Sequence, residues 1–335
     1  MANIILNKNN FFNNLKIILK KTKSKDKIAL VLKDNAYGHG IIEIAEMAQE
    51  FGISRAVVRS YDEALKVEQF FEYVLVLADC PKVYNEKIRY TINDLESIKK
   101  FPESTKVELK VDTGMHRNGI AMDELKEALS EIKKQGLILE AVFTHHRDAD
   151  ELTSEWFWQN ENFKKVKDEL KELAYKNLRF HSSNSASLFR TQSFDEDMAR
   201  VGICAYGCME LPKALEVDGF KPVLSIYAKR ISSRRLKKGE AVGYGATFRA
   251  QKECVVSSYD FGYGDGFLRV ISNNYTTPQS KKLVGRISMD NSLFLCQDEK
   301  ILIFDDARVI ASLAQTIAYE ILTSLKSSIK REVIS

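Results

Sequence analysis

Polar side chains that can do chemistry stand where a series of predicted apolar strands ends. They are Lys33, Lys110, Arg117, His145, His181, Asn184, Ser185 and, opening the last predicted strand, Gly202. In a barrel of parallel strands the carboxyl ends meet at one mouth, and catalytic groups are assembled there. The residue types predict covalent and acid–base chemistry by an amine, with cations and small residues around it to hold an anionic ligand.

Lys33 is the candidate nucleophile. It ends the run IALVLK, and an apolar mouth favours a neutral amine that can form a Schiff base with a carbonyl compound. The bland alternative is a lysine that only reaches from a strand end to solvent. The following loop, DNAYGHG, favours the chemical interpretation, because it offers the hydroxyl of Tyr37 and two glycines that permit close backbone approach.

The segments after the seventh and eighth predicted strands favour a phosphorylated ligand. HSSNSAS and RVGIC supply a hydroxyl, small side chains and free backbone N–H groups. Loops after these two strands are the usual phosphate site of a (β/α)8 barrel.

Eight short apolar runs with amphipathic stretches between them predict that barrel within residues 9–215. The runs are 28–32, 56–58, 73–77, 88–92, 107–111, 137–143, 178–181 and 201–205. After about Leu211 the pattern becomes strand-like, with 222–233, 240–250, 253–264, 282–290 and 292–296 broken by glycines and charged turns. We therefore expect a mostly β domain over 216–335, with residues 1–8 as a candidate addition to it, and helical spacing again over 312–330.

Bulk properties exclude several classes of protein. The net charge of +4 is spread over 335 residues, and no basic run interleaved with aromatics predicts nucleic-acid binding. No segment resembles a signal peptide or a membrane span, so we expect a cytoplasmic protein that does not bind membranes. Five cysteines without CxxC spacing argue against disulfides and a zinc site, and we predict no metal.

Nine segments in order resemble the alanine racemases, a family of enzymes that depend on pyridoxal phosphate (PLP). They are VLKDNAYGHG, LKVDTGMHRNG, FTHHRDAD, HSSNSAS, ARVGICAYG, VGYGATF, GYGDGFLR, GRISMD and TIAYE. One such block is ordinary turn chemistry, but nine in register from Lys33 to Glu320 are specific. The resemblance implies PLP-dependent interconversion of L- and D-alanine, which supplies D-alanine for peptidoglycan, by a homodimer with shared active sites.

The resemblance also implies two catalytic bases. Lys33 carries the cofactor and exchanges the α-proton on one face of the substrate, and Tyr244 of the other subunit acts on the opposite face. A tyrosine hydroxyl is a weak acid, so it needs a cationic or hydrogen-bonding neighbour to act as a base. His145 and Arg200 resemble the residues that provide this.

Three cationic residues are given further roles by the resemblance. Arg200 meets the pyridine nitrogen of PLP and, since arginine keeps its proton, leaves that nitrogen unprotonated. Arg117 contacts the phenolic oxygen of the cofactor and the substrate carboxylate. Lys110 matches a lysine that is carbamylated in many members and then orients this arginine, which would replace Lys–Arg repulsion by attraction.

The remaining implied contacts bind phosphate or substrate. Met289 resembles a residue whose backbone N–H meets the substrate carboxylate from the partner subunit, and Tyr263 one that narrows the entrance from the same side. The positions that match phosphate-binding residues are Tyr37, Ser185, Gly202, Ile203 and Tyr319.

Some positions depart from the family pattern, and three other functions stay open. Asp34 adds a charge beside Lys33, His116 and Asn118 replace small and apolar residues around Arg117, and His146 stands where an aromatic residue is common. A broad-specificity amino-acid racemase differs only in pocket size. A PLP-dependent barrel decarboxylase would show a glycine-rich phosphate run and a cysteine–aspartate motif, which this chain lacks. A non-catalytic PLP carrier would end near residue 220.

Overall fold

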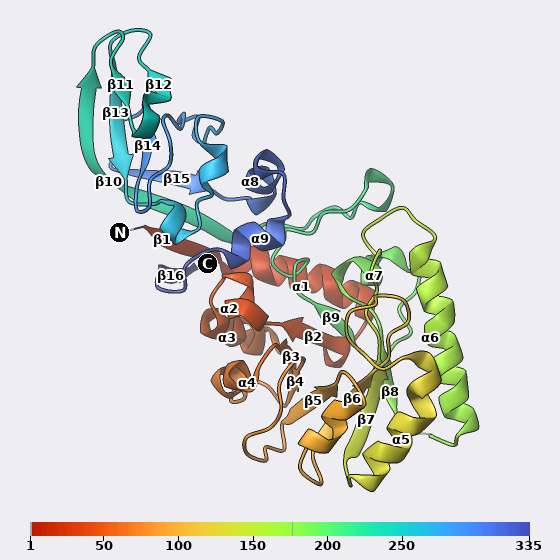
Figure 1. Ribbon diagram of the computed structural model, residues 1–335. Coiled ribbons are helices and arrows are strands. Elements are labelled where there is room, and N and C mark those ends of the chain that lie inside the picture. Colours follow the sequence, from red (N-terminus) through yellow and green to blue (C-terminus); the bar gives the residue numbers. More distant parts are fainter. Residues whose placement is uncertain (1, 176) are drawn as a thin grey trace.

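The computed structural model describes residues 2–175 and 177–335 and shows two parts, a barrel and a β-rich domain beside it (Figure 1). Eight parallel strands form the barrel sheet in the order β8-β7-β6-β5-β4-β3-β2-β9. Their bounds are β2 (Ile28–Val31), β3 (Arg55–Val58), β4 (Tyr73–Val76), β5 (Ile88–Ile92), β6 (Lys106–Lys110), β7 (Ile138–Phe143), β8 (Arg179–His181) and β9 (Ala199–Val201). The predicted (β/α)8 fold class is confirmed.

The barrel strands are continuous apolar runs because both of their faces are covered. Every residue of β2 and β4 is buried, for example. The first and last strands of this order, β8 and β9, and the residues beside them are joined by two backbone hydrogen bonds. Arg200 N–H donates to the Ser183 carbonyl over 2.9 Å, and Asp197 N–H donates to the Phe180 carbonyl over 3.1 Å. The sheet is thereby almost closed.

Helices cover the outside of the barrel. They are α1 (Lys8–Thr22), α3 (Ile41–Phe51), α4 (Tyr61–Val67), α5 (Leu125–Lys134), α6 (Glu155–Glu172) and α7 (Ser185–Arg190). In α5 the buried side chains are Leu125, Ala128, Leu129 and Ile132, the three-and-four spacing that puts one helix face on the sheet. No helix of the described residues is long and apolar enough to cross a membrane.

The eighth barrel strand lies two residues earlier than predicted, so the assignment of 201–205 was wrong. β9 ends at Val201, and the N–H groups of Gly202 and Cys204 point to the Ser185 hydroxyl oxygen, at 3.1 and 3.4 Å, instead of a neighbouring strand. Gly202 therefore follows the strand and does not open it. As a result Arg200 lies within the strand, and the small residues after it form a turn at the barrel mouth.

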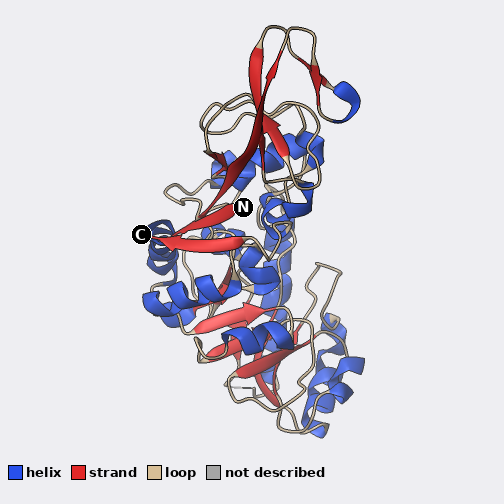
Figure 2. Cartoon of the chain, turned by 90° about the vertical axis from the view of Figure 1, so that its left-hand side faces the viewer, coloured by secondary structure: helices blue, strands red, loops and turns tan. Residues whose placement is uncertain are grey.

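The second domain is built on the 13-residue strand β10 (Leu224–Leu236). The N-terminal strand β1 (Asn3–Asn7) pairs with β10 antiparallel and with β16 (Lys330–Ile334) parallel, so both chain ends meet beside the barrel (Figures 1 and 2). The other strands are β11 (Ala241–Val242), β12 (Phe248–Arg249), β13 (Cys254–Tyr259), β14 (Ser292–Phe294) and β15 (Lys300–Phe304). β15 was not predicted, and 282–290 forms only isolated bridges instead of a strand.

Two short helices follow β15 where one long helical segment was predicted. α8 (Ala307–Ala314) ends because Gln315 adopts a left-handed conformation, and α9 (Ala318–Thr323) follows at once. Residues Lys330–Ile334 form strand β16. α9 packs against α2 (Lys33–Tyr37) at the barrel mouth, and Arg331 of β16 donates two hydrogen bonds to the Gly38 carbonyl, over 2.8 and 3.1 Å. The second domain thus supports the loop that carries Lys33.

Candidate active site

A cavity of about 660 Å³ opens at the carboxyl ends of the barrel strands, with Ile317 and Tyr319 from the α9 region on one side. It brings together most of the site residues expected from the sequence. Those that line it are Lys33, Tyr37, Lys110, Arg117, His145, Ser185, Arg200, Gly202 and Tyr319. The barrel rule places them correctly, because the ends of β2, β6, β7, β8 and β9 all reach this mouth.

Lys33 and Tyr37 are brought to the cavity by an unusual turn. Asp34, Asn35 and Ala36 all have φ between 53° and 55°, and Tyr37 has φ 49°, so the chain makes one left-handed helical turn without glycine. Such a conformation costs roughly 1–2 kcal/mol per residue with a Cβ. Asn35 offsets part of this cost, since its Oδ1 accepts a hydrogen bond from the Ile41 N–H over 2.9 Å. The strain is typical of a functional loop.

The environment of Lys33 differs from the apolar one expected. Its side chain is 37% exposed in the single chain, and Nζ lies 3.9 Å from Oδ2 of Asp34. Oδ1 of Asp34 lies 3.7 Å from the Arg59 guanidinium, which also lines the cavity. The departure at Asp34 therefore places a carboxylate between two cations at the edge of the site.

One end of the cavity has hydroxyl and backbone donors. Ser185 is buried at the start of α7, and Gly202 packs against Tyr37, whose ring lies 5.5 Å from that of Tyr319. Burial raises the pKa of both tyrosines, so both hydroxyls stay protonated and can donate hydrogen bonds. These groups fit a phosphate. Ile203 is buried beside them, but its side chain does not line the cavity.

The opposite wall is cationic. Burial, and then Arg117 and Arg200 nearby, lower the pKa of Lys110 to about 8. Burial lowers the pKa of His145 well below its ordinary value, and Arg200 and Lys110 add to the effect, so this imidazole is neutral. Arg117 follows a tight turn in which Oδ1 of Asp112 accepts from the N–H groups of residues 114 and 115. The wall suits a ligand with several negative groups.

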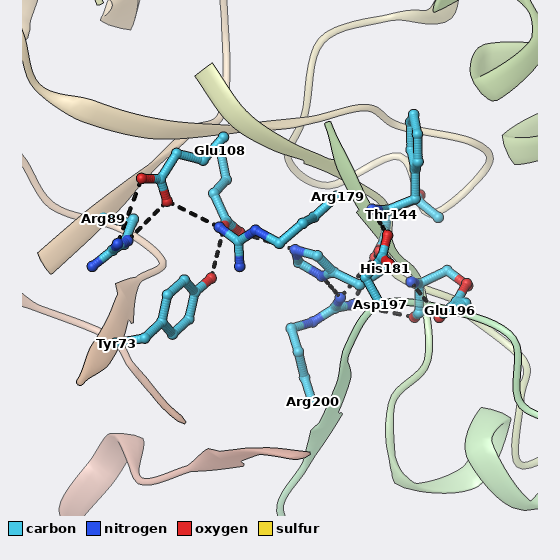
Figure 3. Close-up of polar contacts among 12 residues, drawn as sticks. Tyr73, Arg89, Glu108, Thr144, Arg179, His181, Glu196, Asp197 and Arg200 are labelled. Carbon is cyan, nitrogen blue, oxygen red and sulfur yellow. Dashed lines mark hydrogen bonds and ion pairs between the residues drawn. The ribbon is translucent and has the colours of Figure 1, made fainter. Parts of the chain in front are cut away.

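Arg200 forms the floor of the cavity. One terminal nitrogen, Nη2, donates to the Thr144 carbonyl over 2.7 Å, and the other, Nη1, contacts Nδ1 of His181 (Figure 3). Burial lowers its pKa to about 10, so the guanidinium is still charged at neutral pH. His181, expected at the mouth, is instead fully buried below Arg200, because the side chain of this last β8 residue turns into the barrel.

Three further expected site residues, all from the second domain, do not line this cavity. They are Tyr244, Met289 and Tyr263, which are 64%, 57% and 43% exposed. Tyr244 lies between β11 and β12, two strands in the half of that domain that is remote from the barrel in Figure 1. One chain by itself therefore presents Lys33 without Tyr244.

The sequence reasoning missed other residues on the cavity wall. Arg59, Asn93, Met115, Arg147 and Asp150 all line it, whereas Asn184, which also lines it, was expected at the mouth. Arg59 and Asn93 each follow a barrel strand, so the rule that selected Lys33 could have found them. Among the described residues no group of three histidine, cysteine or acidic side chains could hold a metal ion, and the five cysteines are free.

Fold and cavity define a two-domain barrel enzyme with a lysine, buried hydroxyl groups and a cationic wall around one cavity. The alanine racemase N-terminal domain family matches residues 6–210, and the C-terminal domain family matches residues 223–333. This chain belongs to the alanine racemase family.

Relatives and solved structures agree with this assignment. The chain is 45% identical to an alanine racemase of a Nitratiruptor species over 99% of both chains. It is 42% identical to one of Campylobacter curvus over the full length of both. The crystal structure of alanine racemase from Bacillus anthracis with bound L-Ala-P superposes with a TM-score of 0.90 at 27% identity, covering 100% of this chain and 95% of that one.

Proposed function

We propose that this chain interconverts L- and D-alanine with PLP held on Lys33. The observation that carries the proposal is the cavity itself, where a strand-end lysine, a phosphate cradle and Arg200 surround one ligand-sized space in a chain of this family. The cradle passes a geometric test. A Cβ on Gly202 would lie 2.9 Å from the Tyr37 hydroxyl oxygen, so only glycine keeps the space beside Tyr37 open.

When bound, PLP supplies the electron sink that makes the α-proton of an amino acid removable. The chain would hold its phosphate with Tyr37, Ser185, Tyr319 and the backbone at residues 202 and 203. Arg200 keeps its proton at neutral pH, so it would donate an N–H to the ring nitrogen and leave that nitrogen unprotonated. Arg117 offers a forked guanidinium that suits a carboxylate.

Two bases on opposite faces explain racemisation. Nζ of Lys33 takes or returns the α-proton on its face, and the Tyr244 hydroxyl does the same on the other. Because Tyr244 lies far from the cavity of its own chain, we infer that it comes from a second copy in a homodimer. Met289 and Tyr263 would arrive with it, to bind the substrate carboxylate and to narrow the entrance.

Lys110 is proposed to carry a carbamate. A buried amine beside two arginines, with a pKa lowered to about 8, has enough neutral form near pH 8 to react with carbon dioxide. The product is an anion that can bind Arg117. This change would convert repulsion across the cationic wall into attraction.

Purified protein should be loaded with PLP and given L-alanine, L-serine and L-lysine, with both enantiomers followed by chiral chromatography. We expect D-alanine, and its loss in Lys33→Ala. Comparable rates on all three substrates would instead indicate the broad-specificity racemase, and carbon dioxide release the decarboxylase. Rescue of a bacterium that requires D-alanine would support the inferred supply to peptidoglycan. Bound cofactor with no turnover would contradict the proposal.

A further inference from the structure

A fully buried carboxylate lies two side chains away from the cavity. Glu108 is on β6, two residues before Lys110, so both side chains point into the barrel and Glu108 lies one layer deeper. Its Oε2 lies 2.9 Å from Nε2 of His181. Its Oε1 accepts from the Tyr73 hydroxyl and, over 3.0 Å, from Nη2 of Arg179 (Figure 3). Glu108 is therefore connected to Arg200 through His181.

The proton position on His181 follows from its two partners. Arginine has only donors, so Nδ1 of His181, which faces Arg200, must be the unprotonated acceptor. Burial lowers the pKa of His181, so the ring is neutral and its one proton is on Nε2. Burial opposes the charge on Glu108, but the hydrogen bond from His181, the charge of Arg179 and the Tyr73 hydroxyl lower its pKa and keep it ionised. As a carboxylate it can only accept, which matches an Nε2–H donor.

The opposite tautomer would disturb the cavity floor. With its proton on Nδ1, His181 would face an Arg200 N–H, donor against donor, and the guanidinium would have to move. The rings of His181 and Phe143 are stacked, with 4.7 Å between their centroids and 12° between their planes. This contact keeps the imidazole from rotating away. No ion pair among residues 2–175 and 177–335 joins Arg200 directly to a carboxylate, so its orientation depends on neutral partners.

We propose that Glu108 is a positioning residue, which fixes the tautomer of His181 and thereby holds Arg200 in place at the floor of the cavity. The inference rests on the proposed function, in which Arg200 meets the ring nitrogen of PLP. Glu108 does not reach the substrate or the cofactor, but through Arg200 it would influence the electronic state of the cofactor.

Glu108→Gln tests this with little change of shape. The charged Arg179 and the Tyr73 hydroxyl both need an acceptor, so the amide oxygen should stay with them and the NH₂ group should face His181. Nε2 must then accept, and the proton moves to Nδ1. Glu140→Gln is the matched control, because Glu140 accepts from the same Arg179 over 3.0 Å and also binds Arg89, without contacting His181.

The first measurement is a two-bond ¹H–¹⁵N spectrum of histidine-labelled protein without cofactor, with His181 assigned by its loss in His181→Asn. We expect Nε2–H in the wild type and in Glu140→Gln, and Nδ1–H in Glu108→Gln. The second is the absorption spectrum of bound PLP, which should shift only in Glu108→Gln. The turnover number kcat should fall about tenfold, the effect of one charge-assisted hydrogen bond, with a smaller change in KM for alanine.

Glu108→Asp provides the conservative comparison and should keep Nε2–H and recover part of kcat. If Glu108→Gln matches Glu140→Gln in tautomer, cofactor spectrum and kcat, the inference is overturned. If Glu108→Gln does not fold, Glu108→Asp is the test. A Glu108→Asp protein that has lost the contact to His181 but keeps the wild-type cofactor spectrum and kcat would also overturn the inference. An inactive wild type would instead refute the proposed function, and the tautomer measured without cofactor would still stand.

Discussion

Gly202 lies so close to Tyr37 that a Cβ on the glycine would be 2.9 Å from both the hydroxyl oxygen and one ring carbon of the tyrosine. The tyrosine cannot easily retreat, because its ring lies 5.3 Å from that of Tyr206 and 5.5 Å from that of Tyr319. Gly202 is thus required for space, and the proposed phosphate end of the cavity depends on it.

Gly202→Ala should therefore weaken PLP binding. The added methyl group would displace Tyr37, and overpacking of this kind costs roughly 1–3 kcal/mol, so we expect the Kd of PLP to rise about tenfold or more. Equilibrium dialysis or fluorescence titration of the apoprotein measures it. If the effect acts through Tyr37, Gly202→Ala combined with Tyr37→Phe should lose little more than the worse single variant. Additive losses would argue against this coupling.

Lys110 should destabilise the unmodified protein at neutral pH. Its pKa falls from 10.5 in the unfolded chain to about 8 in the folded one, so between these values unfolding takes up a proton. The penalty is fully present below pH 8 and disappears as the pH rises toward 10.5. In buffer free of carbon dioxide, Lys110→Met should raise the free energy of unfolding by about 1–3 kcal/mol at pH 7 and by less at pH 9.5.

Urea unfolding at the two pH values measures the difference. Lys106→Met on the same strand is a suitable control, since its amine donates to the Glu86 carbonyl over 3.1 Å on the exposed side of the barrel. We expect a change within about 0.5 kcal/mol there. An equal gain for both variants, or a gain independent of pH, would mean that Lys110 carries no buried charge.

Carbamylation of Lys110 gives a separate prediction. Since only the neutral amine reacts with carbon dioxide, labelling by ¹³C-bicarbonate should increase as the pH rises through about 8 and be lost at lower pH. A ¹³C NMR carbamate signal, absent from Lys110→Gln, checks this. A wild-type spectrum without that signal at any pH would show that Arg117 is oriented by something else.

The sequence predicted the barrel well because its strands are buried on both faces. Continuous apolar runs such as 28–31 and 73–76 are unambiguous, and polar residues directly after them must meet at one mouth. That rule alone brought Lys33, Lys110 and Ser185 to one cavity. The roles of these residues came from the resemblance and not from the pattern.

Other features are decided by contacts distant in sequence. The last barrel strand was displaced because the apolar run of residues 201–205 looks like a strand, whereas Ser185 binds the N–H groups after Val201. Glu108 gave no signal, since a glutamate in an apolar strand usually indicates an exposed face. Its partners Tyr73 and His181 come from other strands. Likewise, no local pattern shows that Tyr244 stays outside its own chain's cavity.

The separation of Lys33 and Tyr244 within one chain makes a prediction about assembly. If each active site takes these residues from different subunits, neither Lys33→Ala nor Tyr244→Phe should racemise alanine as a homodimer. Mixing the two and allowing exchange should restore activity, because each heterodimer has one site with both lesions and one with none. Random exchange of equal amounts makes half of the dimers mixed, so recovery should approach roughly a quarter of the wild-type rate by the symmetry of a two-fold dimer.

Two differently tagged variants allow the heterodimer to be purified, which removes the uncertainty of incomplete exchange and raises the expected rate to roughly half that of the wild type. The matched control is a heterodimer of Lys33→Ala with a chain that has both substitutions. It contains the same subunit contacts but no site with both groups intact, so it should be inactive. If both groups came from the same chain, every site in the first heterodimer would still have one lesion. If the purified heterodimer of Lys33→Ala and Tyr244→Phe chains is inactive, the shared site is refuted, because the isolation of this heterodimer already shows that the chains exchange and fold.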